Sequence, residues 1–130
     1  PAVAVIGDST FVHSGMTGLM DAINEDTPVT LVILDNSTVG MTGGQKTAAS
    51  GPNLEKLVKG LGVPEAHVRI VNPISRERDT ITRVLKEEFE HPGVSVVIAA
   101  RICIQEIKRG KKKKQKQAEE QAAQAEEAAK

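Results

Sequence analysis

The sequence predicts an α/β protein built as a doubly wound parallel sheet, with helices covering both faces of the sheet. Four short apolar runs rich in β-branched residues are spread along the chain, and the stretches between them repeat apolar residues at helical spacing. Strands that alternate with helices are joined by right-handed crossovers and therefore run parallel. A chain of 130 residues is long enough for one such domain and too short for two ordinary ones.

The expected strands are short and almost continuously apolar. Strands with this composition are typically buried on both faces between two layers of helices. We expect them at residues 2–6, 29–34, 68–71 and 94–99.

Three helices are expected between the strands, each packing one apolar face on the sheet. Their buried residues are expected to be Met16, Leu19, Met20 and Ile23 in the first, Leu54, Leu57, Val58 and Leu61 in the second, and Ile81, Val84, Leu85 and Phe89 in the third. Asn53 is expected to cap the start of the second helix, which meets Gly60 near its end. Ser75 is expected to cap the third, which His91-Pro92-Gly93 would end.

The domain is expected to span residues 1–107 and to be followed by a charged tail at residues 108–130. The tail has eight basic and four acidic residues and no apolar residue larger than alanine, which predicts an exposed helix or a solvated extension. The domain keeps nine basic and 13 acidic residues, a balance that argues against a nucleic-acid-binding surface. With two Phe and no Trp or Tyr, its core is expected to be aliphatic.

Cysteine content and hydropathy indicate the compartment. The single Cys103, expected in the core or on a helix, excludes an internal disulfide and a cysteine-held zinc or iron–sulfur site made by this chain alone. No apolar run approaches the roughly 20 residues that span a bilayer, and no signal peptide is visible. We therefore expect a cytoplasmic protein without membrane contact. Because Pro1 leads directly into the first strand, we also expect a domain cut from a longer protein.

The first strand runs into a segment suited to an anion and a cation together. Gly7-Asp8-Ser9-Thr10 and His13-Ser14-Gly15 precede the helix expected from Met16. Glycine permits close ligand approach, while hydroxyls and a helix start offer hydrogen-bond donors to phosphate. An aspartate there would repel phosphate unless a cation lay between them, and Mg²⁺ binds one or two protein oxygens together with phosphate oxygens.

The second strand ends in a similar set of oxygen donors. Asp35-Asn36-Ser37-Thr38 follows the first segment after an interval of 25 residues, which fits one helix and one strand. Ligands of parallel sheets bind beyond the carboxyl ends of the strands. We therefore expect the Asn36 side chain and the Thr38 backbone carbonyl to join Asp8 as metal ligands.

These two segments resemble the thiamine diphosphate motif, a Gly-Asp-Gly followed after about 25 to 30 residues by Asn-Asn. With their flanks, VIGDSTFVHSGMTGL and VILDNSTVGMTGGQ, they are similar to the C-terminal thiamine diphosphate-binding domain of the indolepyruvate ferredoxin oxidoreductase alpha-subunit family. The MTGGQ stretch also resembles the TGGQ of the wider 2-oxoacid:ferredoxin oxidoreductases. The resemblance covers roughly residues 2–104. Ser9 and Asp35 depart from the general motif but agree with the indolepyruvate branch.

The resemblance implies a role for particular residues. Metal ligands would be Asp8, Asn36 and the Thr38 carbonyl, and the cofactor would also be contacted by Gly7, Ser9, Thr10, His13, Met41 and Thr42. Met41 would approach the thiazolium ring, within a loop that includes Gly43-Gly44. His13 could donate to the diphosphate or move a substrate proton, or it could simply cap the helix. His67 and His91 are expected on the surface.

The resemblance also implies a function for the parent enzyme: oxidative decarboxylation of a 2-oxoacid, an arylpyruvate, to an acyl-coenzyme A with reduction of ferredoxin. The cofactor would be held between this domain and another one, which supplies a glutamate, and the iron–sulfur clusters would lie elsewhere. The partners would be the remaining domains or subunits of an oligomer, and this chain alone would be inactive.

The same residues argue against two other functions. A GDSL-type esterase would use Ser9 as nucleophile, but it needs a late Asp-x-x-His block that is absent from the chain. A dinucleotide site would need Gly-x-Gly-x-x-Gly, of which only Gly7 is in place. A non-catalytic binding or assembly module of the same fold remains an open alternative.

Overall fold

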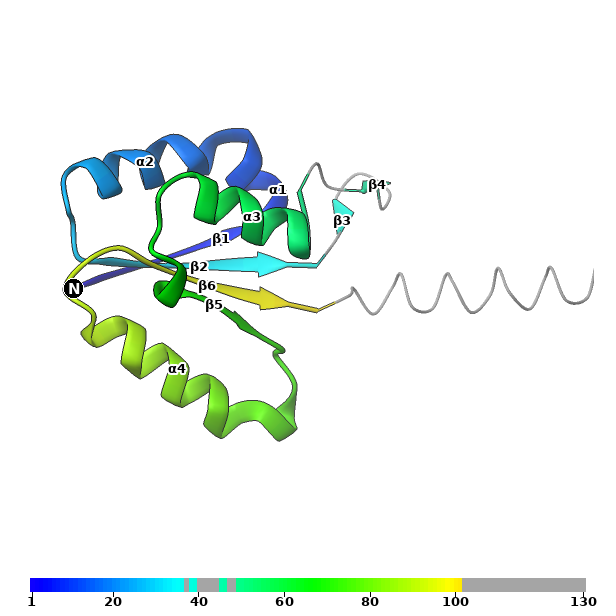
Figure 1. The fold of residues 1–130 in the computed structure, drawn as a ribbon. Helices are drawn as coiled ribbons and strands as arrows, with labels where there is room; N and C mark the ends of the chain where they lie inside the picture. The colour runs from blue at the N-terminus through cyan, green and yellow to red at the C-terminus, as the bar shows by residue number, and fades with distance from the viewer. Residues whose placement is uncertain (37, 40–44, 47–48, 102–130) are drawn as a thin grey trace, which may run out of the picture.

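The computed structural model describes residues 1–36, 38–39, 45–46 and 49–101. Its main body is a four-stranded parallel sheet in the order β1-β2-β6-β5 (Figure 1). The strands are β1 (Ala2–Gly7), β2 (Val29–Asp35), β5 (Val68–Val71) and β6 (Ser95–Ala100). All four expected strands are therefore present.

Helices cover the sheet from both sides, with α2 and α3 on one face and α4 on the other (Figure 1). The helices are α1 (Asp8–Thr10), the π-helical turn η1 (Phe11–Gly15), α2 (Met16–Asn24), α3 (Pro52–Gly60) and α4 (Arg78–Glu90). Two 3-10 turns, η3 (Glu65–His67) and η4 (Ser75–Glu77), precede β5 and α4. The doubly wound α/β architecture is confirmed.

The register of the strands places their carboxyl ends at one edge of the sheet. Ala2 pairs with Val29 and Gly7 with Leu34, so β1 and β2 end side by side. Asp35 pairs with Ala100 at the end of β6. Beyond this edge the short strands β3 (Thr38–Val39) and β4 (Gln45–Lys46) pair antiparallel.

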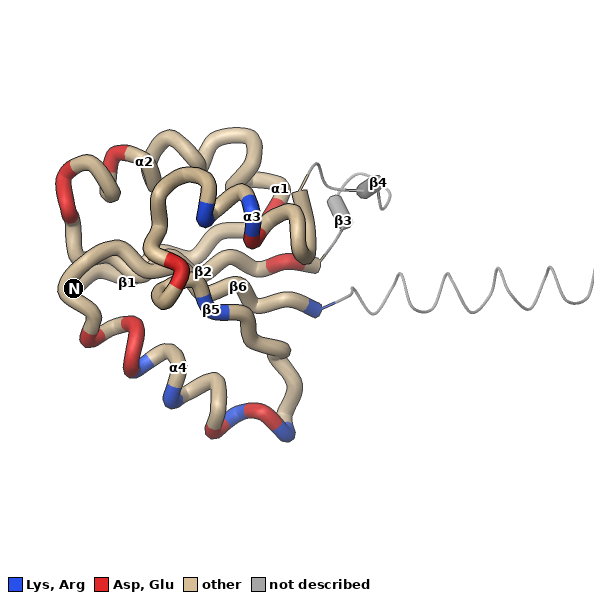
Figure 2. The backbone as a smooth tube through the Cα atoms, viewed as in Figure 1, with Lys and Arg blue, Asp and Glu red and all other residues tan. Residues whose placement is uncertain are grey.

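The main core lies between the sheet and the two helices α2 and α3. Its buried side chains are aliphatic except for one aromatic ring, as expected: Phe11, Leu19, Ile33, Ala49, Leu54, Val58, Val63, Val68, Val94, Val96 and Ile98. A smaller cluster of Val71, Val84 and Val97 lies under α4. Figure 2 shows that charged residues lie mostly on the helices, with few on the sheet.

The first helix begins earlier than the sequence predicted. Helical backbone starts at Asp8, directly after β1, and not near Met16. Leu19 is buried and Met16 packs against the core, but Met20 is 47% exposed, so its expected place in the buried stripe is wrong.

Both predicted helix caps are also wrong. Helix α3 begins with Pro52, whose fixed φ suits the first helical turn, and the capping residue is Gly51; Asn53 therefore lies inside the helix. Ser75 belongs to η4 and α4 begins at Arg78, with no side-chain cap hydrogen bond at its start.

The third helix buries a charged residue that its apolar pattern did not predict. Val84 is buried, Ile81 and Leu85 pack on the smaller cluster and Phe89 is half-buried, in line with the expected stripe. Glu88, however, is only 2% exposed.

The histidines expected on the surface lie partly inside the fold. His67 and His91 are half-buried, and their rings stack with centroids 3.5 Å apart. This stacking joins the end of η3 to the residue that follows α4.

Strand β1 differs from the expectation of a strand covered on both faces. It lies at the edge of the sheet and pairs with β2. Val3 and Val5 are 51% and 64% exposed, on the face where α4 covers the inner strands. The tail at residues 108–130 and Cys103 lie outside the described residues. Among the helices that the structure describes, none is long and apolar enough to cross a membrane.

Candidate functional site

The candidate site lies at the carboxyl edge of the sheet, where β1 and β2 end next to each other (Figure 1). Because Gly7 pairs with Leu34, the residues that follow them, Asp8 and Asp35, lie at the same level at the ends of β1 and β2. The topology thus brings together the two segments that the sequence singled out. Elements α1 and β2 are in contact at this edge.

Asp8 combines deep burial with a position at the start of a helix. Asp8 is 3% exposed, and its Oδ1 accepts a hydrogen bond from the Ser9 backbone N–H at 2.8 Å. Gly7, in extended conformation, precedes the helical backbone, so Asp8 carries its negative charge in the first turn. That placement is favourable, because the backbone N–H groups of a first turn point toward negative charge.

The residues after Asp8 form an unusual helical segment. Three α-helical residues lead into the five-residue π-helical turn η1, whose Phe11 is completely buried. Single π-helical turns within helices occur frequently at functional sites. Ser9 is half-buried, whereas Thr10 and His13 are exposed on this segment. The side chains of Thr10 and His13 are therefore available to a ligand that approaches the carboxyl edge of the sheet.

Asp35 is the buried residue at the end of β2. It is 2% exposed, and its Oδ2 accepts a hydrogen bond from the Gly51 backbone N–H at 2.6 Å. Its backbone carbonyl accepts the Arg101 N–H at 2.9 Å. The sequence analysis placed Asp35 among the oxygen donors at the end of the second strand and as a variation of a motif, but it assigned no role to Gly51.

The remaining predicted site residues divide into two groups. Asn36 is half-buried and follows Asp35 directly, and the backbone of Thr38 lies in β3, in register with Lys46. Met41, Thr42 and Gly43-Gly44 lie outside the described residues.

The donor set of this edge fits a hard cation bridged to phosphate. One carboxylate, one amide and two hydroxyl side chains, those of Asp8, Asn36, Ser9 and Thr10, all offer oxygen. Among the described residues, no three His, Cys, Asp or Glu side chains gather as a metal site. A cation here would therefore need further oxygens from its ligand, which is how Mg²⁺ is usually bound beside phosphates.

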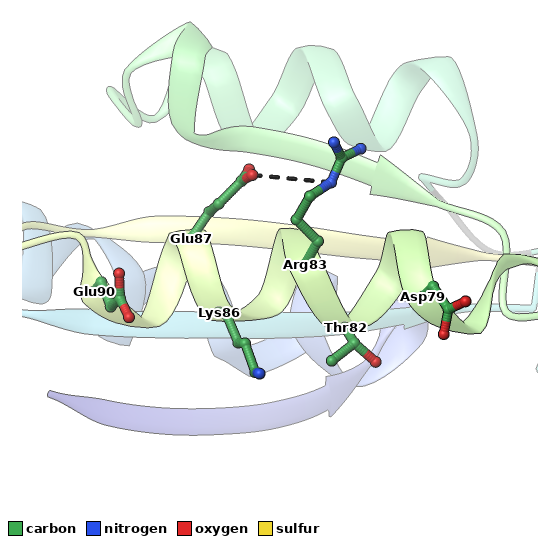
Figure 3. A pocket seen from close by; sticks show the side chains of 6 residues that line it. All are labelled: Asp79, Thr82, Arg83, Lys86, Glu87 and Glu90. Atoms are coloured by element: carbon green, nitrogen blue, oxygen red, sulfur yellow. Dashed lines mark ion pairs between the residues drawn. The ribbon is translucent and has the colours of Figure 1, made fainter.

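Two other concave regions are less suited to a ligand. The first, about 450 Å³, is lined by one face of α4 with mixed charges: Asp79, Thr82, Arg83, Lys86, Glu87 and Glu90 (Figure 3). Its Arg83–Glu87 pair is 4.0 Å apart and largely exposed, as on an ordinary solvated helix. The second, about 280 Å³, is an apolar groove between α2 and the first two strands, lined in part by Ala4, Gly18 and Leu31.

Comparison with known proteins decides the family. Residues 1–99 match the family described as thiamine pyrophosphate enzyme, C-terminal TPP binding domain. The chain belongs to this family. Thiamine pyrophosphate is thiamine diphosphate, so the predicted resemblance to a thiamine diphosphate-binding domain is confirmed.

Relatives of this TPP-binding domain include two indolepyruvate oxidoreductase subunits IorA. The chain is 40% identical over 111 residues to that of Archaeoglobus fulgidus, covering 78% of this chain and 17% of the relative. It is 37% identical over 112 residues to that of Methanothermobacter thermautotrophicus, covering 78% and 18%. The chain thus spans less than a fifth of the length of these relatives.

A solved structure supports the same fold. The X-ray structure of a putative thiamin diphosphate-dependent enzyme from Mycobacterium smegmatis superposes with a TM-score of 0.57 at 23% identity, covering 78% of this chain and 18% of that one. The TPP-binding domain therefore shares its fold with part of a much longer polypeptide.

Proposed function

We propose that this TPP-binding domain holds the diphosphate of thiamine diphosphate through a Mg²⁺ ion at the carboxyl edge of the sheet. Asp8, the Asn36 side chain and the Thr38 backbone carbonyl would bind the cation. Gly7, Ser9 and Thr10 would lie against the diphosphate. The observation that carries this proposal is the buried Asp8 carboxylate in the first turn after β1, beside the end of β2.

The physical reason lies in the burial of the carboxylate. Asp8 is 3% exposed, so solvent screens its charge poorly and its attraction to a divalent cation is stronger than at an exposed site. The Ser9 N–H bond to Oδ1 fixes the orientation of the carboxylate before any cation arrives. The hydroxyls of Ser9 and Thr10 add donors for phosphate oxygens from the same helical turn.

Other residues would contact parts of the cofactor that lie further from the cation. The exposed His13 on η1 would donate to the diphosphate or hold a substrate proton, while Met41 and Thr42 would lie toward the thiazolium ring. When bound, thiamine diphosphate supplies the carbanion chemistry, and the protein supplies binding and orientation.

The parent protein is proposed to be a cytoplasmic 2-oxoacid:ferredoxin oxidoreductase that converts an arylpyruvate to an acyl-coenzyme A. The similarity to indolepyruvate oxidoreductase subunits, of whose length the matched region covers 17% and 18%, supports this assignment. Its further domains or subunits would complete the cofactor site and carry the iron–sulfur clusters, and coenzyme A and ferredoxin would bind there. This domain alone is proposed to bind cofactor weakly and to turn over nothing.

Two alternatives make different demands on the same edge. A non-catalytic assembly module would keep the fold without binding the cofactor. An esterase would require a histidine base at the Ser9 hydroxyl, and among the described residues no hydrogen bond joins Ser9 to a histidine. Cofactor binding therefore separates the first proposal from the alternatives.

The test is titration of the chain with thiamine diphosphate, with and without Mg²⁺, by calorimetry and by the ³¹P NMR shift of the diphosphate. We expect measurable binding only with Mg²⁺. Asp8→Ala should weaken it by at least about tenfold, because a charge-assisted contact is lost and tenfold corresponds to about 1.4 kcal/mol.

The matched control is Asp21→Ala, which removes an exposed carboxylate from α2 and should leave the affinity unchanged. Binding that ignores both Mg²⁺ and Asp8 would contradict the metal-bridged site. A complete lack of binding by a folded chain would contradict the proposal that this domain holds the diphosphate by itself.

A further inference from the structure

One side chain connects the end of β2 to the start of α3. Asp35 is the last residue of β2, and its Oδ2 lies 2.6 Å from the Gly51 backbone nitrogen, 16 positions further along. Asp35 is 2% exposed and Gly51 is half-buried, so the carboxylate side of this hydrogen bond is shielded from competing water. It joins the two ends of the segment that contains Asn36, Thr38, Met41 and Thr42.

Gly51 has a backbone conformation suited to this contact. Its φ of +54° and ψ of −130° are accessible to glycine and strained for residues with a side chain. A Cβ at this position would meet nothing within 4 Å, so the requirement for glycine comes from the backbone angles and not from crowding. Gly51 is followed by Pro52, so the Asp35 carboxylate lies at the favourable positive end of α3.

The backbone of Asp35 is held independently of its side chain. It pairs with Ala100 in the register of β2 and β6, and its carbonyl accepts the Arg101 N–H at 2.9 Å. The carboxylate is therefore presented from a fixed strand end, and the start of α3 is attached to it. Asn36, the next residue, is held by this strand end on its amino side only, and the contact between the Asp35 carboxylate and Gly51 fixes the far end of the segment to which Asn36 leads.

We propose that Asp35 is a positioning residue that fixes both ends of the segment 36–50 and thereby sets the place of the Asn36 oxygen. This inference rests on the proposed function, because it assigns the contact a purpose in cation and diphosphate binding. Asp35 itself does not bind the cation. Its role is to keep its neighbour in place, through the Gly51 N–H.

The first measurement concerns the contact alone and needs no cofactor. In Asp35→Ala, hydrogen exchange at the Gly51 amide should rise by about tenfold or more, as expected for a lost charge-assisted hydrogen bond, while amides of Val97 and Ile98 in β6 stay protected. Unchanged exchange at Gly51 would overturn the proposal. Because no ligand is present, this result is independent of whether the proposed function holds.

The second measurement is the affinity for thiamine diphosphate with Mg²⁺. Asp35→Ala should weaken binding by about tenfold, whereas Asp35→Asn, which keeps an oxygen acceptor for the Gly51 N–H, should restore most of the affinity. Gly51→Ala keeps the N–H donor but strains the backbone that presents it at a φ of +54°, so it should also weaken binding. The double variant should be no weaker than Asp35→Ala, because without the carboxylate acceptor the place of the Gly51 N–H no longer matters.

Two results would overturn the positioning role. If Asp35→Ala lowers the melting temperature but leaves the affinity unchanged, the contact is purely structural. If Asp35→Asn abolishes Mg²⁺-dependent binding while Gly51 stays protected, Asp35 is a metal ligand. If the unaltered chain shows no Mg²⁺-dependent binding, the proposed function fails, and with it the functional purpose assigned to Asp35.

Discussion

At the scale of single residues, Gly15 lets the π-helical turn lie close to the sheet. A Cβ at Gly15 would lie 2.8 Å from Ile6 Cδ1 and 3.0 Å from Phe11 Cδ2. The first distance is shorter than normal van der Waals contact, so any side chain would have to displace these neighbours. Phe11 is the first residue of η1 and Gly15 is the last. Their close packing therefore also holds the helical segment that carries Ser9, Thr10 and His13.

We predict that Gly15→Ala destabilises the domain although alanine favours helices. The added methyl group overpacks the contact with Ile6 and Phe11, which should lower the free energy of unfolding by about 1–3 kcal/mol. Urea denaturation followed by circular dichroism measures this change. The control is Gly18→Ala in α2, where a Cβ meets nothing within 4 Å and a gain of about 0.5–1 kcal/mol is expected. Equal effects at both positions would contradict the packing argument.

The sequence predicted which side chains gather at the edge of the sheet but not what holds them there. Asp8 and Asn36 were predictable because each follows an apolar run that is plainly a strand, and parallel strands end together. The Asp35 contact with Gly51 was not, because it depends on the path of the chain between them. A signal was present in Gly51-Pro52, since glycine followed by proline is a common start of a helix.

At the scale of elements, α4 is attached to the sheet through Glu88 as well as through apolar packing. The Thr30 hydroxyl donates to the Glu88 backbone carbonyl at 3.0 Å, and the Ser95 hydroxyl donates to Thr30 Oγ1 at 3.0 Å. The buried Glu88 carboxylate contacts His67 Nδ1 at 2.9 Å and Arg69 Nη1 at 3.0 Å. One helical residue thus connects β2, β5, β6 and η3.

We predict that Arg69→Ala costs more stability than the loss of an ordinary surface ion pair. It removes a charged donor from a carboxylate that is only 2% exposed, and the expected loss is about 1.5–3 kcal/mol in free energy of unfolding. Arg83→Ala serves as the control, because the Arg83–Glu87 pair is exposed and should contribute about 0–1 kcal/mol. Both are measured by urea denaturation, and similar losses would show that Glu88 does not depend on Arg69.

The polar attachment of α4 and the early start of the first helical segment were not predicted, because both depend on contacts between residues far apart in the sequence. Strands and apolar helix faces were predictable because periodicity records burial directly. Glu88 lies on the buried face of α4, yet a glutamate in the sequence does not reveal that Arg69 and His67 contact its carboxylate. The segment after Asp8 contains serine, threonine, histidine and glycine, which have weak helix propensity. The sequence therefore did not predict a helix there, although tertiary contacts stabilise one.

At the scale of the whole molecule, the sheet has one edge that is apolar on its exposed face. Val3 and Val5 on β1 and Leu34 on β2 are 51%, 64% and 49% exposed. Charged residues and prolines usually keep an edge strand from pairing with another chain, and strand β1 contains neither. We therefore expect the isolated chain to self-associate through β1 at high concentration.

We predict that Val5→Lys reduces this self-association. A lysine on the exposed face of β1 adds charge where two edges would meet, so the mass-average molecular weight in sedimentation at high concentration should fall toward that of the monomer. The matched control is Thr82→Lys on α4, an exposed position away from β1 that receives the same charge. If both variants reduce association equally, net charge and not the β1 edge is responsible.

The strand order has a consequence for how the domain is made. Strand β2, which ends at Asp35 and leads into Asn36, pairs on one side with β1 and on the other with β6. The paired residues Thr30 and Ser95 are 65 positions apart in the sequence. Pairing across such long separations slows folding, because a large loop must close before the contact forms. During synthesis β1 and β2 are available to each other early, but β2 acquires its second neighbour only once β6 has left the ribosome. The edge that gathers the oxygen donors is therefore expected to be completed last, after nearly the whole domain has been translated.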